Sequence, residues 1–375
     1  MLGLDNRIKR MKTIKFVGDE IWQKNFAAAV RQNVNNYFKE RGISTKGNLV
    51  LLSQTVAMLA LYIVPFILLL TTAMTTWLAL AMTIIMGIGM AGIGMCVMHD
   101  AVHGSYSNKE WINKIMGGTM YLLGSNVFNW KIQHNVMHHA YTNIEGYDED
   151  IAVSSVIRLS QFAPVKKIHY YQHILAFFFY GLLTITKLTN DFVQLARYNK
   201  EGITRKFNIN PTMEYAKMVV IKLIYLFVLI GLPLLFTRFA WWQVLLGFVI
   251  MHWAAGCILS TVFQMAHVVE GAEQFEPDAD GIIHTEWAVN EVRTTSDFAR
   301  NNLLLNWYVG GLNFQIEHHL FPNVCHVHYR KIAPIVEKTA KEFGLFYNQK
   351  PSFIAALGSH VRRLKQLGQQ QIVQA

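Results

Sequence analysis

Two long apolar blocks alternate with longer polar segments along the chain. No Asp, Glu, Lys or Arg occurs in residues 47–99, and only Lys222 and Arg238 interrupt residues 218–269. A membrane-crossing helix needs about 20 apolar residues, so each block is long enough for two passes. The pattern therefore predicts four membrane-spanning helices, at about residues 48–70, 76–97, 216–237 and 240–266.

The charges beside these blocks predict an orientation. Residues 1–46 hold ten Lys and Arg against four Asp and Glu. Because Lys and Arg accumulate on the cytoplasmic side, this segment is expected in the cytoplasm. Each apolar block then forms a hairpin that returns the chain to that side. We expect an all-α integral membrane protein with both termini cytoplasmic, in the inner membrane if the cell is bacterial.

The polar segments complete the predicted organisation. We expect a cytoplasmic N-terminal segment over residues 1–46 and one main domain over residues 47–375. Residues 98–214 and 268–345 are predicted to form a helical cap on the cytoplasmic side, followed by a C-terminal tail at 346–375. Two amphipathic stretches, about 112–128 and 168–188, are predicted to lie at the membrane interface.

Composition supports the membrane and narrows the partners. The chain is 52% hydrophobic and 15% charged, whereas soluble domains are typically about 25% charged. Its net charge is +10, but no aromatic-basic recognition motif accompanies the charge. We therefore expect a lipid bilayer and no nucleic acid as partner. The three cysteines form no CxxC pair, so neither a disulfide framework nor a zinc knuckle is predicted.

Seven of the fifteen histidines fall in three clusters beside the predicted spans, on the predicted cytoplasmic side. Spacings of three to five residues place imidazoles on the same or adjoining helix faces, as a shared metal requires. Gln315 leads the third cluster on one face with its two histidines, so all three are expected to face one metal. His267, at the end of the fourth span, is an eighth candidate. The candidate ligands are His99, His103, His134, His138, His139, His267, His318 and His319.

The number and type of ligands predict the metal. Eight imidazoles exceed the four ligands of one zinc ion, so two metals are expected. The sequence contains no HExxH motif, and no Glu precedes a His by three, which excludes the carboxylate-bridged bundle. A nitrogen-rich centre of two iron ions (Fe2+/Fe3+), with O2 as co-substrate, remains. Asp100 and Glu317, next to candidate ligands, are expected to hold imidazole N–H groups.

Three segments resemble the histidine boxes of the membrane fatty acid desaturases: HDAVH from His99, HNVMHH from His134, and GGLNFQIEHHLFP ending at Pro322. The resemblance covers about residues 50–345. It implies that the eight histidines above bind iron, that Gln315 is a ligand or near-ligand, and that Asn313 lies just outside the ligands. It also implies a stem of four spans and a cytoplasmic cap that holds the irons. Gln rather than His at the start of the third box is similar to the front-end group, which inserts a double bond between an existing one and the carboxyl end.

The resemblance implies an oxidoreductase that desaturates long-chain fatty acyl groups, carried on coenzyme A or on a lipid. Many front-end desaturases carry a cytochrome b5 domain with an HPGG haem motif, and HPGG does not occur here. An external electron donor is therefore expected, either a ferredoxin or a cytochrome b5 with its reductase. Glu291 departs from the family pattern, because Gln is expected at its position in WAVNEVRTT.

Three alternatives remain open. The histidine pattern specifies the oxidant rather than the product, so hydroxylation of a lipid, a sterol or a carotenoid is the nearest alternative. A divalent-metal transporter would need charged residues inside the spans, and the predicted spans contain almost none. A zinc-dependent membrane hydrolase would contain zinc instead of iron. The sequence leaves open the position of the new double bond and the acyl carrier.

Overall fold

The computed structural model describes residues 14–152 and 156–369, and most of these residues are helical. Within them, two very short parallel strand pairs join segments that are far apart in the sequence. β1 (Lys15–Phe16) pairs with β2 (Ile282–Ile283), and β3 (Asp297–Phe298) pairs with β4 (Gln349–Lys350). The described part of the chain is therefore mainly α-helical, as the sequence predicts.

Four helices among the described residues are long and apolar enough to cross a membrane: Leu49–Thr71, Thr76–Val102, Pro211–Phe236 and Trp241–His267. The four predicted spans are confirmed as helices, with two shifted ends. The second continues to Val102 instead of ending near residue 97, which brings His99 into it. The third begins at Pro211 instead of near 216, because Pro211 occupies the first turn and the Asn210 side chain caps the Met213 backbone N–H.

Two of these four helices contain π-helical turns. Counted along the chain, the first of the four helices is α2 (Leu49–Thr71) and the fourth is α12 (Trp241–His267), and both are α-helical throughout. The second consists of α3 (Thr76–Gly92), η1 (Ile93–Met98) and α4 (His99–Val102), and the third of α10 (Pro211–Leu226), η5 (Phe227–Gly231) and α11 (Leu232–Phe236). η1 and η5 are π-helical. π-turns often mark functional sites, and η1 directly precedes the first histidine cluster.

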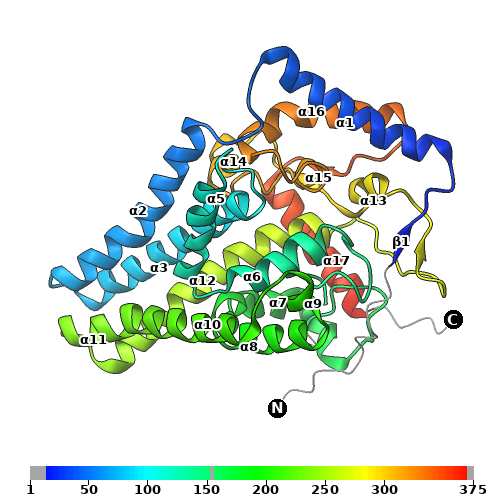
Figure 1. Cartoon of the computed structure of the whole chain (residues 1–375). Coiled ribbons are helices and arrows are strands. Elements are labelled where there is room, and N and C mark those ends of the chain that lie inside the picture. The colour runs from blue at the N-terminus through cyan, green and yellow to red at the C-terminus, as the bar shows by residue number, and fades with distance from the viewer. Residues whose placement is uncertain (1–13, 153–155, 370–375) are drawn as a thin grey trace.

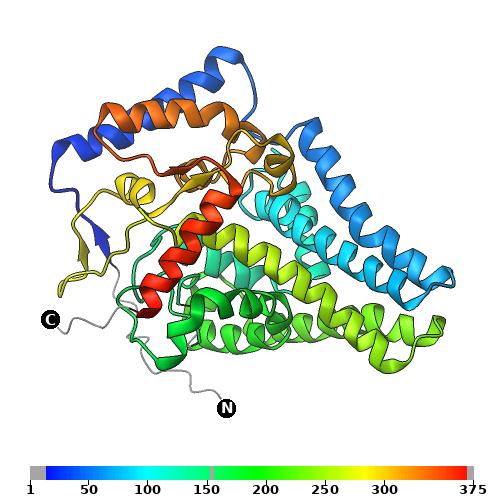
Figure 2. The same ribbon diagram turned by 180° about the vertical axis from the view of Figure 1, so that it is seen from behind.

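The first, second and fourth helices pack closely through glycines. α2 packs along α3, and α3 packs along α12. A Cβ atom at Gly87 would lie 2.6 Å from the Met251 carbonyl oxygen, and one at Gly89 would lie 2.7 Å from the Leu61 backbone. Small residues at these crossings let the backbones approach. The α2–α3 and α11–α12 connections lie together at one end of the molecule, at the left in Figure 1 and at the right in Figure 2.

The other end holds the helices that frame the histidines (Figure 1). There α1 (Ile21–Arg41) packs on α16 (Tyr329–Glu342) and α13 (Trp287–Thr294) through buried Phe26, Val30 and Val34. α17 (Phe353–Gln369) packs on α7 (Gln172–Tyr180) and α12. The remaining elements are α5 (Glu110–Gly117), η2 (Gly118–Leu123), α6 (Val127–Trp130), η3 (Lys131–His138), η4 (Lys167–Tyr171), α8 (Leu183–Lys200), α9 (Ile203–Lys206), α14 (Leu303–Tyr308), α15 (Gln315–Leu320) and η6 (His326–His328).

The two stretches predicted to be amphipathic are helical. Residues 112–128 fall in α5, η2 and α6, with a break at Gly124, whose φ of 71° is left-handed. Residues 168–188 fall in η4, α7 and α8. Large apolar side chains on these helices are exposed, among them Trp111, Ile115, Ile174 and Phe178.

Candidate metal centre

The fold brings the eight candidate histidines together from four segments. His99 lies in α4, with His103 directly after it, and η3 carries the second cluster. α12 ends at His267, and α15 carries the third cluster. All eight side chains are buried, with at most 9% of each residue exposed.

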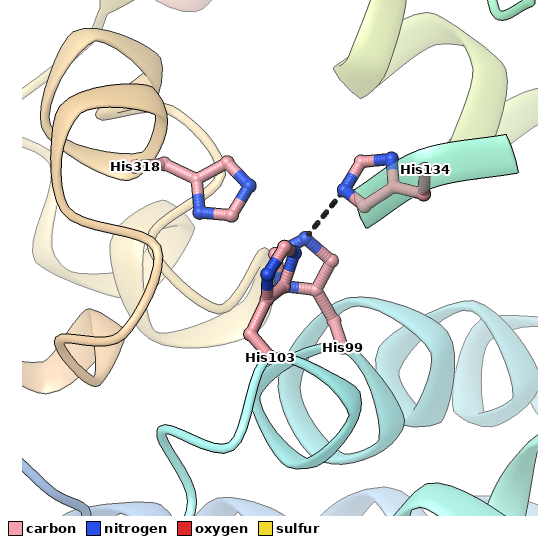
Figure 3. Close-up of side chains that lie close together, drawn as sticks. All are labelled: His99, His103, His134 and His318. Carbon is pink, nitrogen blue, oxygen red and sulfur yellow. Dashed lines mark hydrogen bonds between the residues drawn. The ribbon is translucent and has the colours of Figure 1, made fainter. Parts of the chain in front are cut away.

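His99, His103, His134 and His318 form the first group. Their ring nitrogens lie within 4.8 Å of one another. Figure 3 shows the four side chains turned toward a common centre, with His99 and His103 on one helix and the other two approaching from separate segments. The Nε2 atoms of His99 and His134 are 3.3 Å apart. Such convergence of imidazole nitrogens suits a bound metal ion.

His138, His267 and His319 form the second group, again with ring nitrogens within 4.8 Å of one another. His139 lies between the two groups. Its ring centroid is 4.5 Å from that of His318 in the first group and 4.4 Å from that of His319 in the second. The eight histidines therefore offer two adjoining positions at which metal ions could be held.

A π-helical turn carries the second histidine cluster. The His139 backbone N–H donates to the His134 carbonyl at 3.0 Å, a bond that spans five residues instead of four. The wider turn changes the angle between successive side chains relative to an α-helix. The rings of His134 and His138 are stacked with centroids 5.2 Å apart, and His134 belongs to the first group while His138 belongs to the second.

The third cluster meets one expectation only in part. Gln315, His318 and His319 were expected to face one metal. His318 lies in the first group and His319 in the second, but both also form a set with His139 whose ring nitrogens lie within 4.8 Å of one another. Successive residues on an α-helix are about 100° apart, so neighbouring rings can reach different groups. Gln315 lies near His267, which places its amide beside the second group, and its Nε2 donates to the Leu312 carbonyl at 2.9 Å.

Many of the ring nitrogens have no hydrogen-bond partner, as expected of atoms that bind metal ions. The Nε2 atoms of His103, His138, His318 and His319 are buried without a hydrogen-bond partner, and so is the Gln315 Oε1. A buried polar atom without a partner costs about 1–3 kcal/mol. Several such atoms aimed at two common points are explained if their lone pairs coordinate metals. Both ring nitrogens of His139 and His267 are also without partners.

Carboxylates hold the far side of the second group. The Nδ1 of His138 lies 3.0 Å from both oxygens of Asp148, and the Nδ1 of His319 lies 2.7 Å from Glu291 Oε2. An ionised carboxylate can only accept, so the Nδ1 of His138, which faces both oxygens of Asp148, carries a proton. The Nε2 atom is then the one with a free lone pair, as a metal ligand requires.

Two further partners support the first group. The Nδ1 of His134 lies 3.3 Å from Asp150 Oδ2, and the Nδ1 of His318 lies 3.1 Å from the Tyr329 hydroxyl. Sequence reasoning missed Asp148, Asp150 and Tyr329, and left Glu291 without a role. A signal existed only for the two aspartates, which follow the second cluster closely in YDED.

Burial and charge act against each other at these contacts. Burial favours the neutral imidazole of His138, but the nearby carboxylates, Asp148 foremost, together outweigh it and raise the pKa of His138 to about 9. Burial raises the pKa of Glu291 to about 8, although hydrogen bonds from Thr142 and Asn290 oppose the shift.

The expected supporting residues Glu317 and Asn313 have other partners. Glu317 accepts a hydrogen bond from the Tyr347 hydroxyl at 2.7 Å and makes none with a histidine, because it is two residues from Gln315 and so faces the opposite side of α15. The expectation that Glu317 holds an imidazole N–H is therefore wrong. Asn313 donates to the Phe298 carbonyl at 2.9 Å, which holds the turn before α15, and its place just outside the ligands stays a prediction.

Asp100 is only partly where it was expected. Its Oδ1 lies 3.9 Å from the Nδ1 of His99, too far for a hydrogen bond. Its Oδ2 lies 2.8 Å from the Nδ1 of His326, whose Nε2 lies 3.0 Å from Gln54 Oε1 in α2. Asp100 therefore connects the first histidine cluster to α2 through His326.

Comparisons with known proteins agree with this centre. The model of the Fatty acid desaturase family matches residues 75–351, which contain all eight histidines. The chain is 33% identical to the sn-1 linoleoyl-lipid 6-desaturase of Arthrospira platensis over 91% of this chain and 92% of that protein. It is also 33% identical to the protein of the same name from Synechocystis, over 92% of this chain and 96% of that one.

A third relative is the acyl-lipid (8-3)-desaturase of Physcomitrium patens, with 33% identity over 97% of this chain and 75% of that protein. The family match and these similarities show that the protein is an oxidoreductase that acts on fatty acyl groups. They give no support to the transporter and hydrolase alternatives. The chain belongs to the fatty acid desaturase family.

Proposed function

We propose that the protein is a membrane-bound, O2-dependent desaturase of long fatty acyl chains that acts on acyl groups carried by lipids. The new double bond lies between an existing one and the carboxyl end. The observation that carries the proposal is the convergence of eight buried histidines from four segments into two adjoining groups. Family membership supplies the class of reaction.

The proposed topology follows the long helices. The four helices cross the membrane as two hairpins, and their two connections lie at the same end of the molecule. The histidines lie at the opposite end, in a cap that we place on the cytoplasmic side with both termini. The basic segment before residue 47 supports this orientation. The exposed apolar side chains of α5 and α7 suit contact with the membrane interface.

Two iron ions would be held by the two histidine groups. His99, His103, His134 and His318 would hold one, His138, His267 and His319 the other, and His139 lies within reach of both groups. When bound, the irons supply the oxidising power, with O2 as co-substrate, that removes hydrogen from an unactivated methylene. Gln315, with a free buried amide oxygen beside His267, is a weaker donor next to the second group.

The surrounding residues fix the ligands and keep the site dry. Asp148, Glu291 and Tyr329 hold Nδ1 atoms, which orients the rings toward the centre. Trp130 stacks on His134 with ring centroids 4.4 Å apart and covers that side of the first group. Exclusion of water protects a strong oxidant from side reactions.

The names of the relatives guide the choice of proposed substrate. Two act on linoleoyl lipid and a third on acyl lipid, so a lipid-bound acyl chain is favoured over acyl-coenzyme A. Their names give different positions for the new double bond: two are 6-desaturases and the third is an (8-3)-desaturase. We therefore propose the front-end class and leave the carbon number to measurement.

The reaction consumes two electrons, which a ferredoxin or a cytochrome b5 with its reductase would deliver. The net charge of +10 suits an acidic donor of either kind.

The test is expression in a host that lacks this activity and is fed linoleic acid. Fatty acids from each lipid class and from coenzyme A are separated, and the double bonds are mapped. We expect a new double bond on the carboxyl side of the existing ones, found first in a lipid class. A hydroxylated product, or new bonds only on the methyl side, would contradict the proposal.

Variants of matched chemistry complete the test. His318→Ala removes a buried member of the first group, whereas His284→Ala removes an exposed histidine, whose side chain is 58% accessible. The first variant is expected to form no product, and the second to match the unaltered protein. Equal yields from both would separate the reaction from the histidine centre.

A further inference from the structure

Asn143 occupies an unusual place beside the second group. It is fully buried, and its φ of 57° lies in the left-handed region, which non-glycine residues other than Asn and Asp rarely adopt. Its side-chain Nδ2 faces three backbone carbonyls at once: those of His267 at 2.9 Å, Glu273 at 3.0 Å and Thr294 at 3.0 Å. One amide group therefore joins three segments that are distant in the sequence.

Two of these carbonyls and the Asn143 backbone lead to the second group. The His267 carbonyl belongs to a candidate ligand at the end of α12. The Thr294 carbonyl ends α13, the helix that carries Glu291, which holds the Nδ1 of His319. The Asn143 backbone N–H donates to Asp148 Oδ2 at 2.8 Å, and Asp148 in turn holds the Nδ1 of His138.

We infer that Asn143 is a positioning residue that fixes the positions of the three histidines of the second group relative to one another. The inference rests on the proposed metal centre, which it deepens. Three carbonyl oxygens that converge on one point repel one another, and only a donor between them makes their approach favourable. The two N–H groups of an amide, on a backbone that accepts φ of 57°, meet this need.

Two substitutions separate the side chain from the backbone. Asn143→Asp keeps the size and tolerates the left-handed backbone, but it replaces the donor by an acceptor that the three carbonyls repel. Asn143→Gly keeps the backbone conformation and removes the amide. Asn208→Asp is the matched control, because Asn208 has a φ of 54° and is exposed.

The experiment measures iron per chain in the purified full-length protein, its Mössbauer spectrum, and its release to a chelator. His267→Ala serves as the reference for loss of the second group. We expect Asn143→Asp to retain about half of the iron of the unaltered protein, with the same remaining spectrum as His267→Ala. Asn143→Gly is expected to bind the second iron about 10- to 100-fold more weakly, the usual effect of removing a residue that supports a ligand. Asn208→Asp should match the unaltered protein.

The outcomes are distinguishable. Full iron with unaltered affinity in Asn143→Gly would overturn the inference, and so would equal loss from both groups. If Asn143→Asp and Asn143→Gly both elute as unfolded protein in detergent, the residue supports the whole fold and the inference is again wrong. Absence of bound iron from the unaltered protein would instead overturn the proposed metal centre.

Discussion

Asp148→Asn is the substitution with the clearest expected effect. Asp148 is fully buried, and both of its oxygens accept backbone N–H groups: Oδ2 from Asn143 at 2.8 Å and Oδ1 from Asp150 at 2.9 Å. The His138 Nδ1 lies 3.0 Å from each oxygen. Whichever way the new amide turns, its NH2 group faces an N–H donor, so one buried N–H loses its partner.

The magnitude follows from these contacts. An unpaired buried N–H costs about 1–3 kcal/mol, and a hydrogen bond to a charged group contributes about 1.5–3 kcal/mol. Since His138 loses its orienting charge, we expect iron in the second group to bind about 10- to 100-fold more weakly, equivalent to about 1.4–2.7 kcal/mol. Product formation in a fed host should fall at least in proportion.

The assay is the competition of purified protein with a graded series of iron chelators, followed by iron analysis. Asp280→Asn is the control, because Asp280 is exposed. Iron affinity of Asp148→Asn within about twofold of the control would refute the reasoning that this carboxylate orients a ligand.

Three further predictions address other parts of the molecule. Gln315→Ala should lower double-bond yield per iron severely while most of the iron stays bound, and Gln315→His should do less harm because it restores a ligand; near-normal yield from the Ala variant would make Gln315 a packing residue. Turnover at limiting donor should slow as salt rises, since the net charge is +10; salt-independent turnover would count against charge steering. Asp191→Ala should destabilise the protein by about 3–5 kcal/mol, because Lys222 Nζ, 2.9 Å from Asp191, loses its buried partner; an unchanged melting temperature in detergent would contradict this.

The sequence predicts the four long helices and the clusters of candidate histidines, because both depend on local patterns. A run of apolar residues identifies a long helix, and histidines at helical spacing identify a cluster without any distant contact. The ends of the spans are less certain, as Pro211 shows, since capping starts that helix before its apolar run. The junction of His267 with the three clusters could be anticipated only from its depth at the end of α12.

The supporting contacts could not be predicted in the same way. Glu291 and Tyr329 reach their histidines through the tertiary fold, across sequence separations that no spacing reveals. Glu317 shows the opposite error, because adjacency to His318 in the sequence places it on the far face of the helix. The division of His318 and His319 between the two groups likewise depends on where α15 lies relative to η3 and α12.

The most direct test of the central claim is the metal content of the purified protein, measured for iron and zinc together. Two adjoining histidine groups predict about two irons per chain, since one ion uses only about four such ligands. His318→Ala and His319→Ala should each lower this number, the first through the first group and the second through the second. A protein that holds one metal per chain, or that holds zinc and converts no fatty acid, would contradict the account.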